Sequence, residues 1–199
     1  MFDLNEVNIN LSRRGFISCV VPDAAAALEK SLEIIGRDSV GIGGSLTVKE
    51  LGLAERLREA GNAVYWHWTD GPLAKNGAAH ADIYVCSANA LTVGGIPVLT
   101  DGSGNRISAM CNGPRRALLI VGKNKIVGDE REALMRIRSA ECAGANAKRL
   151  GLHTPCADDG VCDDCASPER ICSVTAFFER PSKGLMKTYV VLVDKNLGL

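Results

Sequence analysis

The stretch SVGIGGSLTVKELGLAERLREAG, residues 39–61, indicates the fold class of this chain. It begins as a short apolar strand that ends in glycines, and a helical pattern follows at once over residues 46–61. Within that pattern Leu46, Leu53 and Leu57 recur on one face, as in an amphipathic helix. A strand that runs directly into a helix is typical of parallel sheets, whose strands need such crossover connections.

The same alternation continues on both sides of this stretch. We predict helices at 4–14, 24–35 and 129–151; strands at 15–22, 63–68, 81–88, 95–100 and 117–122; and two C-terminal strands joined through residues 181–184. The central strands are apolar throughout, as expected when helices cover both faces of a sheet. We therefore predict an α/β layered domain with a mainly parallel central sheet, carrying a C-terminal β-hairpin.

Composition and charge exclude several classes of protein. The 199 residues are 46% hydrophobic, and 23 basic side chains balance 23 acidic ones. This balance gives no electrostatic footprint for nucleic acid or an anionic membrane. No run approaches the roughly 20 apolar residues of a membrane span, and we expect a cytoplasmic protein. In that reducing compartment, clustered cysteines more often bind metal or do redox work than form structural disulfides.

A glycine turn is the first candidate ligand site. Gly43, Gly44 and Ser45 lie between the strand at 39–44 and the helix at 46–61. Glycines there allow close backbone approach to a phosphate or carboxylate, and α/β sheets bind such ligands beyond the carboxyl ends of their strands. A tight strand-to-helix turn explains the same glycines equally well, so both interpretations stay open.

A second candidate lies in the segment DGSGNR and in the polar residues around it. The turn chemistry of the segment fits a hairpin between strands at 96–100 and 106–110, but a turn does not require an arginine. A guanidinium can hold a carboxylate or phosphate with two hydrogen bonds. The candidate ligand residues here are Asn89, Asp101, Gly102, Gly104, Asn105 and Arg106, joined by Asn124 and Lys125, which otherwise belong to a solvated loop.

Four of the eight cysteines gather in one short acidic stretch. Cys156, Cys162, Cys165 and Cys172 follow the spacing C-x5-C-x2-C-x6-C. Three interpretations compete: a 4Fe-4S cluster held by four thiolates, a structural Zn²⁺, or no metal, with free thiols or a disulfide between Cys162 and Cys165. We favour the cluster because the ligands come from one continuous loop of irregular spacing, whereas zinc sites usually use two CxxC pairs. About twenty residues without apolar periodicity cannot build a core, so a metal would supply the folding free energy.

Several motifs together carry a resemblance to a known family. GIGGSLTVKELGL, SANALTVGG, DGSGNR and VGKNKIV occur in this order and resemble the LUD domain, named for lactate utilisation. The segments NAKRLGLHTPC, GVCDDCASPERIC and KNLGL resemble a cysteine-bearing branch of that family. The resemblance implies the fold shared by ribose-5-phosphate isomerase, the acyl-CoA transferases and 5-formyltetrahydrofolate cyclo-ligase. It also implies a link to oxidation of lactate to pyruvate, alongside iron–sulfur partner proteins.

These observations lead to one principal hypothesis and two alternatives. The principal hypothesis is a redox-linked subunit or accessory in oxidation of lactate or a similar 2-hydroxy acid. It would bind a small anionic ligand and pass electrons through an iron–sulfur cluster to iron–sulfur partners. The alternatives are a transferase or ligase-like enzyme for an acyl or phosphate ligand with a structural zinc, and a non-catalytic scaffold. No general base stands out, so the sequence leaves open whether the chain catalyses alone and whether it forms a homo-oligomer.

The expected organisation is one main domain with an inserted loop. Residues 1–154 are predicted to form the LUD-like α/β domain, and residues 155–172 the four-cysteine metal loop. Residues 173–199 are predicted to return to the main domain as its last strands.

Overall fold

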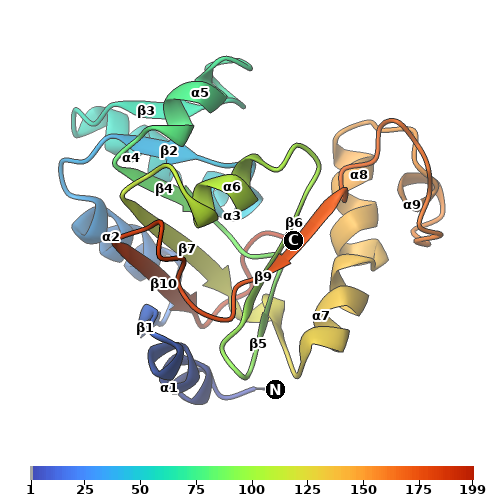
Figure 1. Cartoon of the computed structure of the whole chain (residues 1–199), viewed down its shortest axis with the longest axis horizontal. Coiled ribbons are helices and arrows are strands. Elements are labelled where there is room, and N and C mark those ends of the chain that lie inside the picture. The colour runs from blue at the N-terminus through green and yellow to red at the C-terminus, as the bar shows by residue number, and fades with distance from the viewer. Residues whose placement is uncertain (1) are drawn as a thin grey trace.

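The computed structural model describes residues 2–199, and its centre is a six-stranded sheet in which all neighbours are parallel (Figure 1). This confirms the predicted α/β class with a parallel central sheet. The strand order is β1-β10-β7-β4-β2-β3. The strands are β1 (Ile17–Val21), β2 (Val40–Ile42), β3 (Val64–Trp66), β4 (Ile83–Cys86), β7 (Arg116–Gly122) and β10 (Lys187–Val193).

Alternate side chains of each strand pack into two different cores. In β7, Ala117, Leu119 and Val121 join one core cluster, whereas Leu118 and Ile120 join the other. Because successive side chains of a strand point to opposite faces, both faces of the sheet are buried. One face packs against α2 (Ala24–Ile35), α3 (Leu46–Glu50) and α4 (Leu53–Glu59); the other packs against α1 (Leu4–Arg14), α5 (Ala74–Ala79) and α6 (Asn105–Cys111).

A second, four-stranded sheet adds a further layer on the α1 and α6 side. Its order is β8-β5-β6-β9, with β5 (Ala90–Thr92), β6 (Pro97–Asp101), β8 (Ile126–Val127) and β9 (Val174–Phe177). Leu91 and Leu99 pack into the core shared with the central sheet, whereas Val98 packs with Ile137 of α7 (Glu130–Ile137). Figure 1 shows this sheet between the central sheet and the α7 helix.

The predicted C-terminal β-hairpin is wrong. Both strands form, but β9 pairs antiparallel with β6 in the second sheet, and β10 lies between β1 and β7 in the central sheet. The physical reason is burial. Residues 190–193 of β10 are four consecutive apolar side chains with no exposed surface, which suits a central strand covered on both faces.

The two longest predicted helices are interrupted. The helix predicted over 46–61 divides into α3 and α4 at Gly52, whose φ of 64° is left-handed and ends the first helix. The helix predicted over 129–151 divides into α7, a π-helical turn at Ala140–Gly144 and α8 (Ala145–Arg149). In that turn a Cβ on Gly144 would lie 2.7 Å from the carbonyl oxygen of Cys156, so the glycine lets the cysteine segment approach closely.

Residues 105–111 form helix α6, and not the strand of a hairpin that one interpretation of DGSGNR required. The sequence patterns also left out α5, β5, β8 and the four-residue helix α9 (Pro155–Asp158), all of which are short. No helix formed by residues 2–199 has the length and apolar character needed to cross a bilayer.

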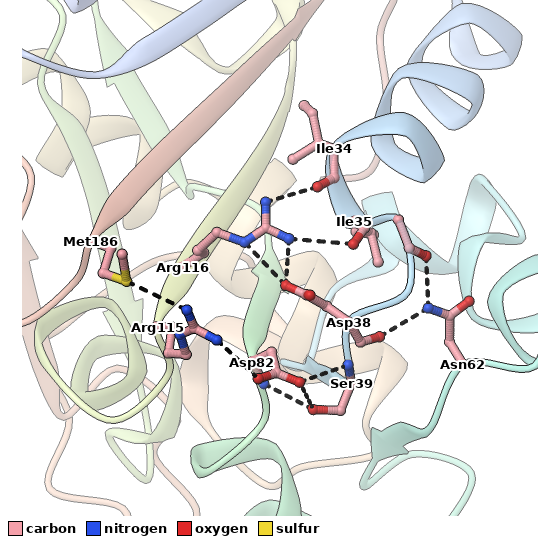
Figure 2. Close-up of polar contacts among 10 residues, drawn as sticks. Ile34, Ile35, Asp38, Ser39, Asn62, Asp82, Arg115, Arg116 and Met186 are labelled. Carbon is pink, nitrogen blue, oxygen red and sulfur yellow. Dashed lines mark hydrogen bonds and ion pairs between the residues drawn. The ribbon is translucent and has the colours of Figure 1, made fainter.

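A polar network ties together the amino ends of three central strands (Figure 2). Arg116, at the start of β7, donates to the carboxylate of Asp38 and to the carbonyl oxygens of Ile34 (2.9 Å) and Ile35 (3.3 Å) at the end of α2. A cation there satisfies carbonyls that a helix leaves unpaired. The Ser39 hydroxyl donates to Asp82 over 2.6 Å, which joins the starts of β2 and β4. At the amino ends of these strands, the polar groups are therefore satisfied by contacts within the protein.

Candidate functional site

A cavity of about 380 Å³ lies at the end of the central sheet where the carboxyl ends of four strands meet. Ser45 follows β2, His67 follows β3, Ser87 follows β4 and Lys125 follows β7, and all four line the cavity. Open α/β sheets bind their ligands in this position because loops of several strands converge there. The location therefore makes this cavity the candidate ligand site.

Most of the ligand residues predicted from the sequence lie in the wall of this cavity, although they come from distant parts of the chain. Those in the wall are Gly44, Ser45, Asn89, Asp101, Gly102, Asn105, Arg106 and Lys125. The remaining three, Gly43, Gly104 and Asn124, lie outside the wall.

Gly43 and Asn124 support neighbouring residues. A Cβ on Gly43 would stand 2.7 Å from Cγ of Arg106, so the glycine makes room for the arginine. Gly104 has a left-handed φ of 76° and precedes α6. Asn124 holds the last residues in place, because its Oδ1 accepts from the Leu197 amide at 3.1 Å and its Nδ2 donates to the Gly198 carbonyl at 3.1 Å.

Arg106 is held by an acidic partner and two neutral ones. Its Nε lies 3.8 Å from Oδ1 of Asp101, and its side chain also donates to Asn89 Oδ1 (3.3 Å) and to the Thr100 carbonyl. The Arg106 amide donates to Asp101 Oδ2 over 2.7 Å, which fixes the start of α6. Both side chains are mostly buried, so Asp101 balances the charge of Arg106 and sets the direction of its guanidinium.

Lys125 is a buried amine without an acidic partner. Only 4% of it is exposed, and its Nζ donates to the hydroxyls of Thr47 (2.8 Å) and Ser87 (3.1 Å). Those hydroxyls donate onward to the carbonyls of Leu197 and Ala88. Among residues 2–199 no carboxylate forms an ion pair with Lys125. Burial, with repulsion from the nearby arginines, lowers the pKa of Lys125 to about 7.

The charged lining is mainly basic. Its side chains include four basic ones, Arg106, Lys125, Arg149 and Arg170, and one acidic one, Asp101. The guanidinium of Arg149 stacks 4.9 Å from the ring centre of Trp68, which holds it at the cavity wall. The excess of basic groups in a partly dry space favours a small anion as ligand.

Several lining residues were not found from the sequence, namely Thr47, Ser87, Arg149 and Arg170. Ser87 lies near the carboxyl end of the strand predicted at 81–88, so its place at that end of the sheet was a usable signal. Arg149 and Arg170 reach the cavity from the helical segment after β8 and from the cysteine loop, and no local pattern marks such a meeting. His67 also lines the cavity, where burial lowers its pKa.

The four cysteines of the acidic stretch line one second cavity, of about 210 Å³. All four thiols are half-buried and none forms a disulfide. Burial raises the pKa of Cys172, and the neighbouring Cys162 and Cys165 add to that rise against the opposing effect of Arg170. Residues that are sixteen positions apart in the sequence therefore face a common space.

The cysteine loop is held by polar contacts more than by apolar burial. Residues 159–173 form no helix or strand. Arg170 donates to the Cys165 carbonyl over 2.8 Å and forms an ion pair with Asp164 at 2.7 Å. Asp164, between two of the cysteines, has a φ of 57°, the only positive value at a non-glycine residue in the described chain. The Ser173 amide then ties the loop to the Asp101 carbonyl at 3.1 Å.

The four cysteines line a common cavity, but the described residues do not form a metal-ion site. Four sulfurs around one Zn²⁺ would lie roughly 3.8 Å apart, given a zinc–sulfur bond of about 2.3 Å and tetrahedral geometry. Across residues 2–199, no three Cys, His, Asp or Glu side chains are grouped closely enough to hold a metal ion. A 4Fe-4S cluster would need its four thiolates further apart than a zinc ion does, because each would bind a different iron.

The two cavities share a wall. Thr100, Ile137, Ala143, Arg170 and Cys172 line both the basic cavity and the cysteine cavity. One thiol of the loop thus borders the space in which an anion would bind. A Cβ on Gly102 would lie 3.1 Å from Cα of Ile171, so the DGSGNR segment and the cysteine loop are in close contact at this wall.

Comparison with known proteins supports the architecture. The LUD domain model matches residues 4–193. The crystal structure of a DUF162 family protein from Deinococcus radiodurans is similar, with a TM-score of 0.60 and 15% sequence identity over 96% of each chain. At that identity the similarity concerns the fold. No curated protein matches the sequence.

Proposed function

Because this chain belongs to the LUD domain family, we propose that it is a redox-linked subunit or accessory in oxidation of lactate or a similar 2-hydroxy acid. In this proposal the basic cavity binds the carboxylate of the acid or of its 2-oxo product. Cys156, Cys162, Cys165 and Cys172 hold a 4Fe-4S cluster, which when bound supplies one-electron transfer. The protein works in the cytoplasm, with iron–sulfur proteins as its electron partners.

One observation carries the proposal, namely the wall that the two cavities share. An anion in the basic cavity would be separated from the cysteine cavity by Cys172, Arg170 and the side chains beside them. Electron exchange requires such closeness, whereas a purely structural metal could lie anywhere in the fold. The adjacency therefore favours a redox role over a structural one.

The residues of the basic cavity have distinct parts in binding. Arg106 would hold the carboxylate, since Asp101 and Asn89 already fix the direction of its guanidinium. Arg149 and Arg170 add further positive charge to the cavity lining. The helix after the glycine turn, α3, spans only five residues, and the Ser45 hydroxyl already accepts from its Val48 amide. Side-chain cations thus matter more here than helix amides.

Replacement of Arg106 with alanine should weaken the binding of small carboxylates by roughly 10- to 100-fold, the equivalent of one or two charge-assisted hydrogen bonds. The loss also leaves Asp101 unpaired and repulsive toward an anion. Calorimetric titration with lactate, pyruvate and phosphate measures the effect. Arg115→Ala is the matched control, because Arg115 lies at the other edge of the sheet with a side chain 69% exposed. Equal affinities of the wild type and Arg106→Ala would contradict the assignment.

A further inference from the structure

Lys125 has a buried amine that simple anion binding does not require. Its Nζ lies at the carboxyl end of β7, held between the hydroxyls of Thr47 and Ser87, and it faces the same cavity as Arg106. A buried ammonium is costly unless a carboxylate pairs with it. None does so in residues 2–199, whereas Arg106 in the same cavity has Asp101.

We propose that Lys125 forms an imine with the carbonyl carbon of a small 2-oxo acid bound in the basic cavity. The choice of ligand rests on the proposed function, since a 2-oxo acid is what oxidation of a 2-hydroxy acid yields. The covalent step itself goes beyond that function and makes Lys125 a nucleophile.

The surroundings of Lys125 meet the requirement for a nucleophilic amine, which must be uncharged. Desolvation and neighbouring cations are the two means by which proteins keep a lysine neutral. Both act here: burial, with the charges of Arg136 and Arg106, outweighs the opposing effects of Cys142 and Glu50 and lowers the pKa of Lys125 to about 7. An ordinary lysine, with a pKa near 10.4, is almost entirely protonated at neutral pH.

The hydroxyl partners also favour this role. Thr47 and Ser87 already donate to the carbonyls of Leu197 (3.3 Å) and Ala88 (3.2 Å), so they act as acceptors toward the amine. Two neutral acceptors direct two N–H bonds without supplying the negative charge that would stabilise an ammonium. The amine is thereby positioned in the cavity wall, and proximity to a bound ligand replaces a bimolecular encounter.

The step balances as a simple condensation. The Nζ lone pair forms a bond to C2 of the 2-oxo acid, and the carbonyl oxygen becomes the hydroxyl of a carbinolamine. That oxygen then leaves as water with the two hydrogens that the neutral amine carried, and a C=N bond remains. No oxidant or reductant is consumed. Arg106 holds the carboxylate next to the reacting carbon.

Borohydride trapping tests the imine. The full-length protein is incubated with pyruvate, reduced with sodium borohydride, digested and analysed by mass spectrometry. We expect one modified lysine, Lys125, which gains the mass of pyruvic acid less one oxygen atom. The yield should rise between about pH 6 and pH 8, as the amine loses its proton. Lactate, which has no carbonyl, should suppress the adduct by occupying the same cavity.

Two conservative variants separate this site from ordinary lysine chemistry. Lys125→Arg keeps the positive charge but cannot form an imine, and it should give no adduct. Lys123→Arg is the matched control and should retain the adduct, because Lys123 is two residues away and ion-paired with Asp194 at 3.0 Å.

Absence of an adduct in the wild type, or equal labelling in Lys125→Arg, overturns the inference. If calorimetry shows that pyruvate binds while no adduct forms, the imine fails and the proposed function stands; if pyruvate does not bind, the proposed function fails.

Discussion

Lys125→Met is expected to raise the free energy of unfolding of the ligand-free protein at neutral pH by an amount on the order of 4 kcal/mol. The wild-type chain buries Lys125 at 4% exposure without a carboxylate partner, and its pKa falls from 10.5 to about 7. Each unit by which folding lowers the pKa of a lysine costs the folded state about 1.4 kcal/mol, at a pH where the unfolded chain carries the charge. Methionine is of similar length and carries no charge, and Thr47 and Ser87 keep their hydrogen bonds to carbonyls.

The pH dependence of this effect has a definite sign. Between about pH 7 and pH 10.5 the unfolded chain binds a proton at Lys125 that the folded chain does not bind, so the stability of the wild type rises with pH across this window. Lys125→Met removes that rise, and the two proteins converge in stability near about pH 10. Urea unfolding at pH 7 and pH 9.5 measures the difference, with Lys123→Met as the control, since Lys123 is only partly buried and is paired with Asp194. A Lys125→Met protein that is less stable than the wild type at pH 7 would contradict the reasoning.

A substitution that stabilises the protein by this much indicates that the original residue is kept for function. Proteins retain buried, unpaired charges mainly at binding and catalytic sites, where stability is lower than the fold could reach. We therefore expect Lys125→Met to be more stable and at the same time unable to form the pyruvate adduct.

Conversion of any one of Cys156, Cys162, Cys165 and Cys172 to serine should remove nearly all iron and acid-labile sulfide from the protein. All four thiols line one cavity, and a neutral hydroxyl binds iron far more weakly than a thiolate. Iron per chain and the absorbance near ~400 nm after anaerobic purification measure the loss. The controls are Cys111→Ser and Cys19→Ser, since both residues lie outside that cavity.

Loss of the cluster should also loosen the loop. Residues 159–173 have no helix or strand and few apolar contacts, so the bound cluster would supply much of their order. Hydrogen exchange of this segment should accelerate in Cys165→Ser while β7 and β10 remain protected. Full iron content in all four serine variants, or an equal loss in Cys111→Ser, would contradict the assignment of these ligands.

The fold was largely predictable because its strands are short apolar runs separated by amphipathic helices. Pairing was harder, since burial and not sequence order decides which strands become neighbours. Residues 190–193 (VVLV) are buried on both faces and lie in the middle of the central sheet, although their position near the end of the chain suggested a hairpin. A continuous apolar run is a better indicator of a central strand than proximity to another strand in sequence.

The site was predictable in part for the same reason. Gly44, Ser45 and Arg106 belong to local motifs with unusual turn chemistry, so the sequence identified them. Arg149 and Arg170 belong to no such motif and enter the cavity only through tertiary packing. The burial of Lys125 was also hidden, because the sequence GKNK around it resembles a solvated loop, whereas Thr47 of α3 and Ser87 after β4 hold its amine in the interior.

Electron paramagnetic resonance of the dithionite-reduced protein, recorded with and without saturating pyruvate, tests the coupling of the two cavities most directly. We expect a reduced-cluster signal whose line shape changes when the anion binds on the other side of Cys172 and Arg170. The change should be absent in Arg106→Ala, which keeps the four thiols and loses the anion. A protein that gives no cluster signal, or a spectrum that pyruvate leaves unaltered, contradicts a redox centre beside a carboxylate site.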